Sequence, residues 1–151
     1  MIVQNVMSKK VITISSGSTL KEAAQILVKH KISGAPIVDK EGNLIGIISE
    51  KDLFKALFPG LHELLADIKL WLYHQEIEDR TKDNEKIIVN EIMTKEVLTI
   101  EPDTPVMRAG SLMLTRGIHR LVVFDRHEKK VVGIVSRGDI FRHILKRHLK
   151  I

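Results

Sequence analysis

Two short segments of the chain contain a serine followed three residues later by an aspartate. One runs from Ser49 to Asp52 and the other from Ser136 to Asp139, and each follows an apolar stretch that contains a glycine. A serine and an acidic residue at this spacing form a capping box, which satisfies free N–H groups at the start of a helix. The same oxygens, at the positive end of a helix, can also accept hydrogen bonds from a bound ligand. From the residues alone we favour the cap.

The two segments belong to an internal repeat that covers most of the chain. Residues 7–39 match residues 93–125 at a spacing of 86, and residues 46–54 match residues 133–141 at a spacing of 87, after one residue is inserted in a turn. The chain therefore contains two copies of a unit of about 55 residues, near the lower end of domain size. Because so small a unit buries little surface alone, we expect the copies to pack against each other.

Each copy shows the same predicted order of elements: a short strand, a helix, two strands joined by a hairpin turn, and a last helix. Thr19 and Glu22 form a capping box at the start of the first helix, and Thr104 is the expected N-cap of its counterpart, with Pro105 as the first helical residue. The sequence therefore predicts an α/β (α+β) fold of two β-α-β-β-α units. The predicted strands are 11–14, 35–38 and 44–48 in the first copy, and 97–100, 121–124 and 131–135 in the second.

An insert separates the copies. Its apolar residues recur at helical spacing over 61–72, which we interpret as a helix packed on the body of the protein. A lid or a dimer contact through Trp71 and Tyr73 is the alternative. The predicted domains are residues 1–57 for the first copy, 58–88 for the helical insert and linker, and 89–151 for the second copy with its C-terminal helix.

Composition excludes several kinds of site and favours anionic partners. The chain has 151 residues, of which 44% are hydrophobic and 28% charged, as in a globular protein. It has no cysteine, which excludes disulfides and thiolate sites and agrees with a cytoplasmic location. No signal peptide and no bilayer-spanning apolar run is seen, so we expect no membrane association. The net charge of +5 favours nucleotides, nucleic acids or acidic proteins as partners.

The two copies contain six short motifs. They are V-M-S at 6–8, S-G-A-P-I-V-D at 33–39, G-I-I-S-E-K-D at 46–52, I-M-T at 92–94, I-H-R-L-V-V-F-D at 118–125 and G-I-V-S-R-G-D at 133–139. Taken together and in both copies, these motifs resemble the CBS domain family. The second copy is similar to the CBS repeats of the gamma subunit of the AMP-activated kinase, which have a similar His-Arg before a strand. The resemblance implies a CBS pair, or Bateman module, whose copies pack with pseudo-two-fold symmetry and leave two clefts between them. In the family these clefts often bind AMP, ADP, ATP or S-adenosylmethionine, the module regulates another activity, and pairs commonly form dimers.

The resemblance implies that each cleft uses residues of both copies. An adenine would rest on aliphatic walls, and its ribose would bind a serine and an aspartate at the start of a last helix. For each aliphatic residue, ordinary core packing is the alternative role. One cleft would combine Ser8, Ile12, Ile32 and Ala35 with Ser136 and Asp139, and the other would combine Thr94, Leu98, Ile118 and Leu121 with Ser49 and Asp52.

His119 and Arg120 are the residues best suited to bind a phosphate. They precede a strand whose residues are apolar, at a place where a surface charge is not required. Arginine can form two parallel hydrogen bonds with a phosphate, and histidine can donate another. Lys51 and Arg137, inside the two serine–aspartate segments, are further candidates. Their alternative is an ordinary solvated position in the first turn of a helix.

We interpret the chain as a regulatory module with an adenosine ligand as its effector and with no required cofactor. The ligand would bias the arrangement of the copies or a homodimer interface, and so control a regulated protein that the sequence does not identify. An enzyme is not supported, because no nucleophile lies beside an evident base and no metal-ligand set or phosphate loop is present. We therefore predict no catalytic residue and no metal. The alternative is a nucleic-acid-binding or protein scaffold that uses the basic C-terminal helix at 142–150.

Overall fold

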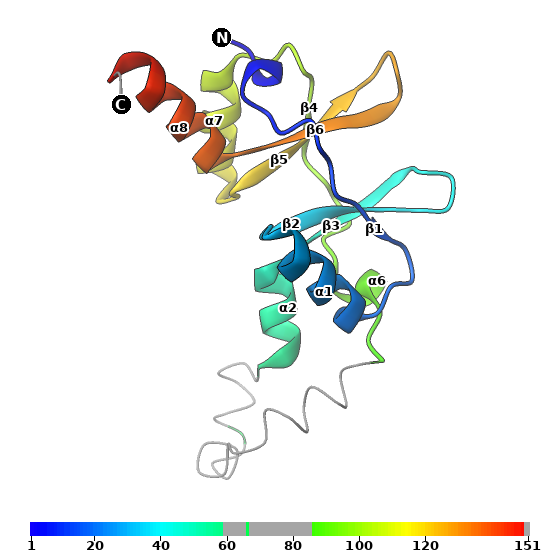
Figure 1. The fold of residues 1–151 in the computed structure, drawn as a ribbon. Coiled ribbons are helices and arrows are strands. Elements are labelled where there is room, and N and C mark those ends of the chain that lie inside the picture. The colour runs from blue at the N-terminus through cyan, green and yellow to red at the C-terminus, as the bar shows by residue number, and fades with distance from the viewer. Residues whose placement is uncertain (59–65, 67–85, 150–151) are drawn as a thin grey trace. The chain divides into compact units, whose positions relative to one another are not determined.

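The computed structural model describes residues 1–58, 66 and 86–149, which form two compact units. Residues Ile12–Lys95 form one unit, and Met1–Val11 together with Glu96–Ile151 form the other. We name them after their capping serines, the Ser49 unit and the Ser136 unit. Each contains one three-stranded sheet and its helices (Figure 1), which confirms the predicted α/β (α+β) fold with tandem repeats.

The Ser49 unit has the predicted β-α-β-β-α order, followed by a short helix from beyond the insert. Strand β1 pairs in parallel with β2, and β2 pairs antiparallel with β3. The predicted apolar helix at 61–72 and its aromatic residues fall almost entirely outside the described residues. The elements are β1 (Ile14–Ser15), α1 (Leu20–His30), β2 (Gly34–Val38), β3 (Leu44–Ser49), α2 (Glu50–Leu57) and α6 (Val89–Ile92).

The Ser136 unit repeats this arrangement and adds a 3₁₀ helix from the N-terminal segment. Strand β4 pairs in parallel with β5, and β5 pairs antiparallel with β6. The topology of the two sheets is therefore the same. The elements are η1 (Val3–Asn5), β4 (Thr99–Ile100), α7 (Val106–Arg116), β5 (Arg120–Asp125), β6 (Lys130–Ser136) and α8 (Arg137–His148).

Two local details differ from the prediction. The first strand of each copy is shorter than predicted, and that of the first copy also lies later in the chain, because only Ile14–Ser15 and Thr99–Ile100 pair with the neighbouring strand. Helix α7 begins one residue later than predicted, with Pro105 at the N-cap, because the ψ of that proline is 134° and therefore extended. Thr104 makes no cap. Its carbonyl instead accepts a hydrogen bond from the Val3 N–H at 2.8 Å.

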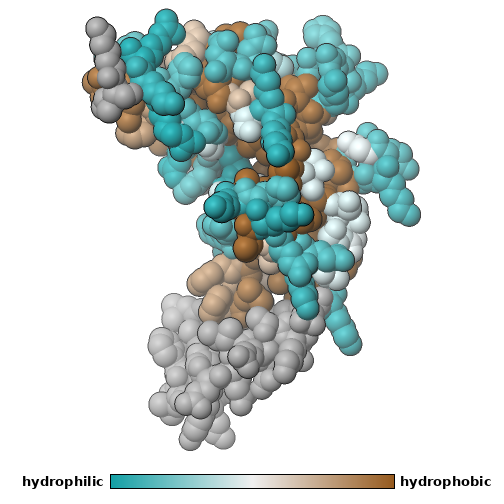
Figure 2. Space-filling model, in the orientation of Figure 1, coloured by the Kyte–Doolittle hydropathy of each residue, from teal (hydrophilic) through white to brown (hydrophobic). Residues whose placement is uncertain are grey.

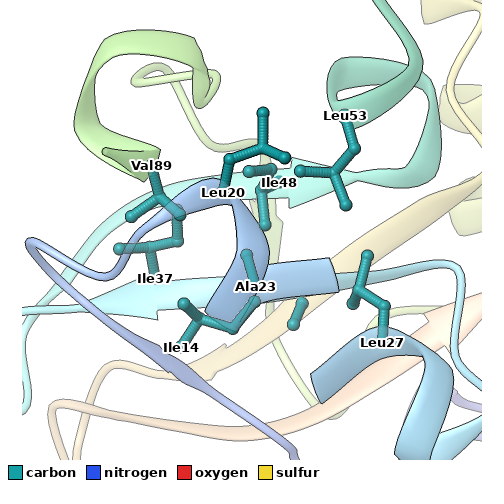
Figure 3. Close-up of a cluster of buried hydrophobic side chains, with 9 residues drawn as sticks. Ile14, Leu20, Ala23, Leu27, Ile37, Ile48, Leu53 and Val89 are labelled. Carbon is teal, nitrogen blue, oxygen red and sulfur yellow. The ribbon is translucent and has the colours of Figure 1, made fainter. Parts of the chain in front are cut away.

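Each unit has its own hydrophobic core, and each core includes a valine from a short helix outside its main repeat. Val89 of α6 is completely buried among the strands and helices of the Ser49 unit (Figure 3). Val3 of η1 takes the same place in the Ser136 unit. The buried residues are Ile14, Leu20, Ala23, Leu27, Ala35, Ile37, Ile48, Leu53 and Val89 in the first core, and Val3, Val106, Ala109, Met113, Leu121, Val123, Val135 and Ile140 in the second.

A short segment at the start of each copy is bonded to the sheet of the other copy. Thr94 and Ile47 exchange two backbone hydrogen bonds of 2.9 and 3.0 Å, and Ser8 and Ile134 exchange two of 2.8 and 3.0 Å. The compact units therefore differ from the sequence copies at these segments. The predicted domain boundaries, after residues 57 and 88, follow the sequence repeat and stay a prediction.

A glycine in each of the strands β3 and β6 permits this close approach. A Cβ atom added to Gly46 would lie 3.2 Å from the Thr94 carbonyl oxygen, and one added to Gly133 would lie 3.0 Å from that of Ser8. Each added Cβ would also meet the side chain of a methionine in the same segment. The apolar–glycine–apolar pattern before each capping serine is thus explained by packing.

Candidate functional site

The starts of α2 and α8 are built as the same capping box. In α8 the Ser136 N–H and Oγ–H both donate to Asp139 Oδ2, at 2.8 and 2.6 Å, and the Asp139 N–H donates to Ser136 Oγ at 3.1 Å. In α2 the Ser49 N–H and Oγ–H donate to Asp52 Oδ2 at 2.8 and 2.9 Å, and the Asp52 N–H donates to Ser49 Oγ at 3.4 Å. The predicted caps are confirmed in both copies.

One backbone hydrogen bond in each unit places the start of the helix beside the start of the middle strand. The Arg137 N–H donates to the His119 carbonyl at 3.0 Å, and the Glu50 N–H donates to the Ser33 carbonyl at the same distance. The repeat and the backbone therefore agree that Arg137 corresponds to Glu50 and that His119 corresponds to Ser33. Lys51, the other candidate cation inside a serine–aspartate segment, corresponds instead to Gly138 because the spacing in this region is 87.

The second carboxylate oxygen distinguishes the two aspartates. Oδ1 of Asp139 accepts a hydrogen bond and ion pair from Arg142 Nη2 at 2.7 Å, one turn along α8. Oδ1 of Asp52 has no hydrogen bond to any residue that the structure describes. Each cap thus uses only one oxygen. A carboxylate at a helix start can therefore complete the cap and still offer an oxygen to a hydroxyl group.

An arginine and a histidine meet beside the start of α8. Arg137 Nη2 lies 2.7 Å from Nε2 and 2.9 Å from Nδ1 of His119, and both side chains are exposed. Arg120 is the first residue of β5 and is paired in register with Ser136. Three of the predicted phosphate-binding residues therefore lie at the same end of the sheet as Ser136 and Asp139.

The predicted polar residues of the short segments lie near the caps as well. Ser8 is bonded to Ile134, two residues before Ser136, and it is exposed. Thr94 has the same relation to the start of α2 through its bonds to Ile47. Each predicted set of serine, aspartate and segment residue therefore falls within a single unit. Lys51 is exposed in the first turn of α2.

The aliphatic residues predicted to contact the adenine lie in or against the hydrophobic cores of the two units. Ala35 and Leu121 have no exposed surface and belong to the cores of their own units. Three others, Ile32, Leu98 and Ile118, are half-buried and pack against those cores. Core packing is thus one role of these residues. Their contact with an adenine, and that of the half-buried Ile12, stays a prediction because each set lies in the unit that does not contain its serine and aspartate.

Two residues that matter here were missed by sequence reasoning. Arg142 could have been found from its position three residues after Asp139 on a helix, a spacing at which opposite charges meet. Glu50 could have been found by extending the 87-residue spacing to position 137.

Within residues 1–58, 66 and 86–149, no three histidine, aspartate or glutamate side chains gather into a metal site, and no helix is long and apolar enough to cross a bilayer.

Comparisons with known proteins agree with this architecture. A family model described as CBS domain matches residues 3–59 and 89–146. The uncharacterized protein MJ1426 of Methanocaldococcus jannaschii is 33% identical, over 96% of this chain and 92% of its own length. The L-aspartate semialdehyde sulfurtransferase of the same organism is 36% identical over 93% of this chain, which spans only 23% of that enzyme.

The solved structures include a similar domain pair with ligands. The CBS domain pair of protein MJ0100, in complex with 5′-methylthioadenosine and S-adenosyl-L-methionine, is 33% identical with a TM-score of 0.72, covering 97% of this chain and 98% of its own. CBSX2 of Arabidopsis thaliana, 24% identical with a TM-score of 0.74, shares the fold over 97% of this chain. The repeat, the two matching sheets and these similarities lead to one conclusion: the chain belongs to the CBS domain family.

Proposed function

We propose that the chain is a regulatory module that binds an adenosine compound at its serine–aspartate helix starts. The CBS domain pair of MJ0100, similar over nearly its whole length, was solved with 5′-methylthioadenosine and S-adenosyl-L-methionine. Both compounds contain a ribose with neighbouring hydroxyl groups. The chemistry that this chain must supply is therefore a pair of hydrogen-bond acceptors for those hydroxyls, beside a surface for the base.

The observation that carries the proposal is that each aspartate uses only one of its two carboxylate oxygens for the cap. Oδ2 of Asp52 and of Asp139 accepts the cap bonds, and Oδ1 of each takes no part in them. A ribose hydroxyl that donates to a carboxylate forms a charge-assisted hydrogen bond, worth about 1.5–3 kcal/mol. At Asp139 the hydroxyl would share Oδ1 with Arg142, since an ionised carboxylate oxygen accepts more than one hydrogen bond.

The predicted aliphatic residues complete the proposal. In the sequence prediction, the adenine at Ser136 and Asp139 rests on Ile12, Ile32 and Ala35. A ligand that uses residues of both units would favour the arrangement in which it binds, and this preference is the source of a regulatory signal. AMP, ADP, ATP, 5′-methylthioadenosine and S-adenosylmethionine are all candidate effectors on this basis.

Thermal stability in the presence of these compounds tests the proposal. A ligand that binds only the folded protein stabilises it by about 2.7 kcal/mol at a concentration one hundred times the Kd, so Tm should rise with concentration. The protein must first be refolded from denaturant to remove bound ligand. The double variant Asp52→Asn, Asp139→Asn should lose the effect while keeping most of its cap bonds. If none of the five compounds raises Tm, the proposal is wrong.

A homodimer belongs to the same proposal, and the helices offer a surface for it. Met107 and Leu114 of α7 and Phe141 of α8 are 75%, 73% and 62% exposed, and they line a cavity of about 530 Å³. Hydrophobic side chains reach the surface of the Ser136 unit beside hydrophilic ones (Figure 2). Phe54, at the position equivalent to Phe141, is 61% exposed. We expect sedimentation to show a dimer that Phe141→Glu weakens, and a monomer at all concentrations would contradict this part.

A further inference from the structure

We propose that the two helix starts bind adenosine compounds of different charge. The start of α8 would take a compound with an anionic group on the 5′ carbon, such as a phosphate. The start of α2 would take one whose 5′ group is neutral or cationic, such as a thioether or a sulfonium. This inference rests on the proposed function and concerns the selectivity of its sites.

The backbone is equivalent at the two helix starts. The residue after each capping serine donates its N–H, at 3.0 Å, to the carbonyl of the residue before the middle strand. Both serine–aspartate caps have the same bonding pattern. Side chains at positions 137 and 50 therefore leave the backbone at the same place relative to the ribose-binding carboxylate. Any difference between the sites must come from the side chains.

Those side chains have opposite charges. Position 137 is an arginine whose guanidinium lies against the ring of His119, so two groups with N–H donors stand together beside the cap. Position 50 is an exposed glutamate, and the residue in the place of His119 is Ser33. An anionic group close to the cap would thus meet an arginine in one unit and a carboxylate in the other.

The neighbouring charges support the same distinction. At the start of α8, Arg137 is accompanied by Arg120 and by Arg142, which offsets the charge of Asp139. The first two turns of α2 contain two acidic residues and two lysines, so their formal charges sum to zero. The residues there are Glu50, Lys51, Asp52 and Lys55.

The carboxylate oxygens that the caps do not use also differ between the two helix starts. Oδ1 of Asp139 is already paired with an arginine, whereas Oδ1 of Asp52 has no hydrogen bond within the described part of the chain. The start of α2 therefore keeps more of its negative potential, which favours a neutral or positive group. The start of α8 has a surplus of donors, which favours a phosphate.

AMP and 5′-methylthioadenosine form a matched pair of probes, because they share the adenosine and differ at the 5′ group. Calorimetric titrations on Asp52→Asn would report the α8 site alone, and titrations on Asp139→Asn the α2 site alone. We expect the α8 site to bind AMP about tenfold more tightly than 5′-methylthioadenosine, with the preference falling as salt is raised. The α2 site should show no preference for AMP, or the reverse preference.

Charge exchange then tests which residue sets the preference. Arg137→Glu should remove the preference of the α8 site for AMP, and Glu50→Arg should create one at the α2 site. Arg108→Glu is the control, since it makes the same charge change at an exposed position of α7 in the same unit. The ratio of the two affinities is the measurement, so a general loss of folded protein cancels.

The outcomes separate this inference from the proposed function. If the wild-type protein binds neither adenosine nor any of AMP, ADP, ATP, 5′-methylthioadenosine and S-adenosylmethionine, the proposed function itself fails. If adenosine binds but both sites show the same ratio of affinities, only the charge selectivity is wrong. The same holds if Arg137→Glu leaves the ratio unchanged or alters it no more than Arg108→Glu does.

Discussion

Substitutions at Asp139 should separate its structural role from its role in binding. Asp139→Ala removes the acceptor of the part-buried Ser136 N–H and Oγ–H, and also the partner of Arg142. Leaving a partly buried donor unsatisfied costs about 1–3 kcal/mol. The exposed ion pair adds at most about 1 kcal/mol, since the Arg142 side chain is 67% exposed. We expect Asp139→Ala to lower the free energy of unfolding by about 2 kcal/mol.

Asp139→Asn should have a different balance of effects. One amide oxygen can still accept the cap bonds, although neutral hydrogen bonds are about half as strong as charge-assisted ones. We therefore expect a smaller loss of stability, about 1 kcal/mol. The amide NH₂ takes the place of Oδ1 and can only donate, so the ribose hydroxyl loses its acceptor. The affinity for AMP should fall at least about tenfold, which corresponds to about 1.4 kcal/mol.

Urea unfolding without ligand and calorimetric titration with AMP measure the two effects separately. Asp52→Asn is the matched control for stability. Its Oδ1 has no partner among the described residues, so this variant loses no ion pair and should be destabilised less than Asp139→Asn. The reasoning would be refuted if Asp139→Asn were as unstable as Asp139→Ala, or if it bound AMP as tightly as the wild type.

Three further predictions concern the scaffold. Gly133→Ala should destabilise the protein by about 1–3 kcal/mol because its Cβ would meet the Ser8 carbonyl. Gly110→Ala is the control and should stabilise the protein, since Gly110 lies on α7 with open space around it. Equal effects of the two substitutions in urea unfolding would contradict the packing argument. Lys31 ends α1 at a φ of 51°, so Lys31→Gly should raise stability by up to about 1 kcal/mol, and a lower Tm would count against strain at this residue. Hydrogen bonds from the backbone and then the side chain of Asn43 lower the pKa of Asp39, so the stability from this carboxylate is present above its usual pKa of 3.8 and is lost as pH falls through the lower folded value. Asn43→Ala should raise the Asp39 pKa in an NMR titration, and an unchanged pKa would show that the side-chain bond is not a cause.

The predictable parts of the fold are those that local chemistry determines. The starts of α1, α2 and α8 are where the capping residues indicate, and α7 ends at Gly117 with a φ of 62°, as predicted from the glycine. Pro105 and the first strands were placed less well. For the strands, the reason is that β1 has only two residues paired with its neighbour, and no periodic pattern can be read from so short a pairing.

The packing of the segments around Ser8 and Thr94 on the sheet of the other copy could not be predicted from the sequence. Val3 and Val89 are single buried residues of short helices, and one apolar residue has no period from which a buried face could be inferred. The choice of the sheet on which each segment packs is a long-range choice. It depends on the fit of a methionine and a carbonyl against Gly46 or Gly133, which appears only when both parts are placed in space.

The comparison of the two copies distinguishes what folding requires from what selectivity can use. Serine and aspartate form the cap at both helix starts, and a glycine precedes them in both because a segment packs closely there. The residues around the cap are exposed, and they differ in charge: Glu50 stands where Arg137 does, and Ser33 where His119 does. A substitution on such a rim changes the stability of the fold little, since exposed charges contribute at most about 1 kcal/mol. The same change at a bound phosphate alters a direct charge interaction, so the rim is the place where one scaffold can acquire two selectivities.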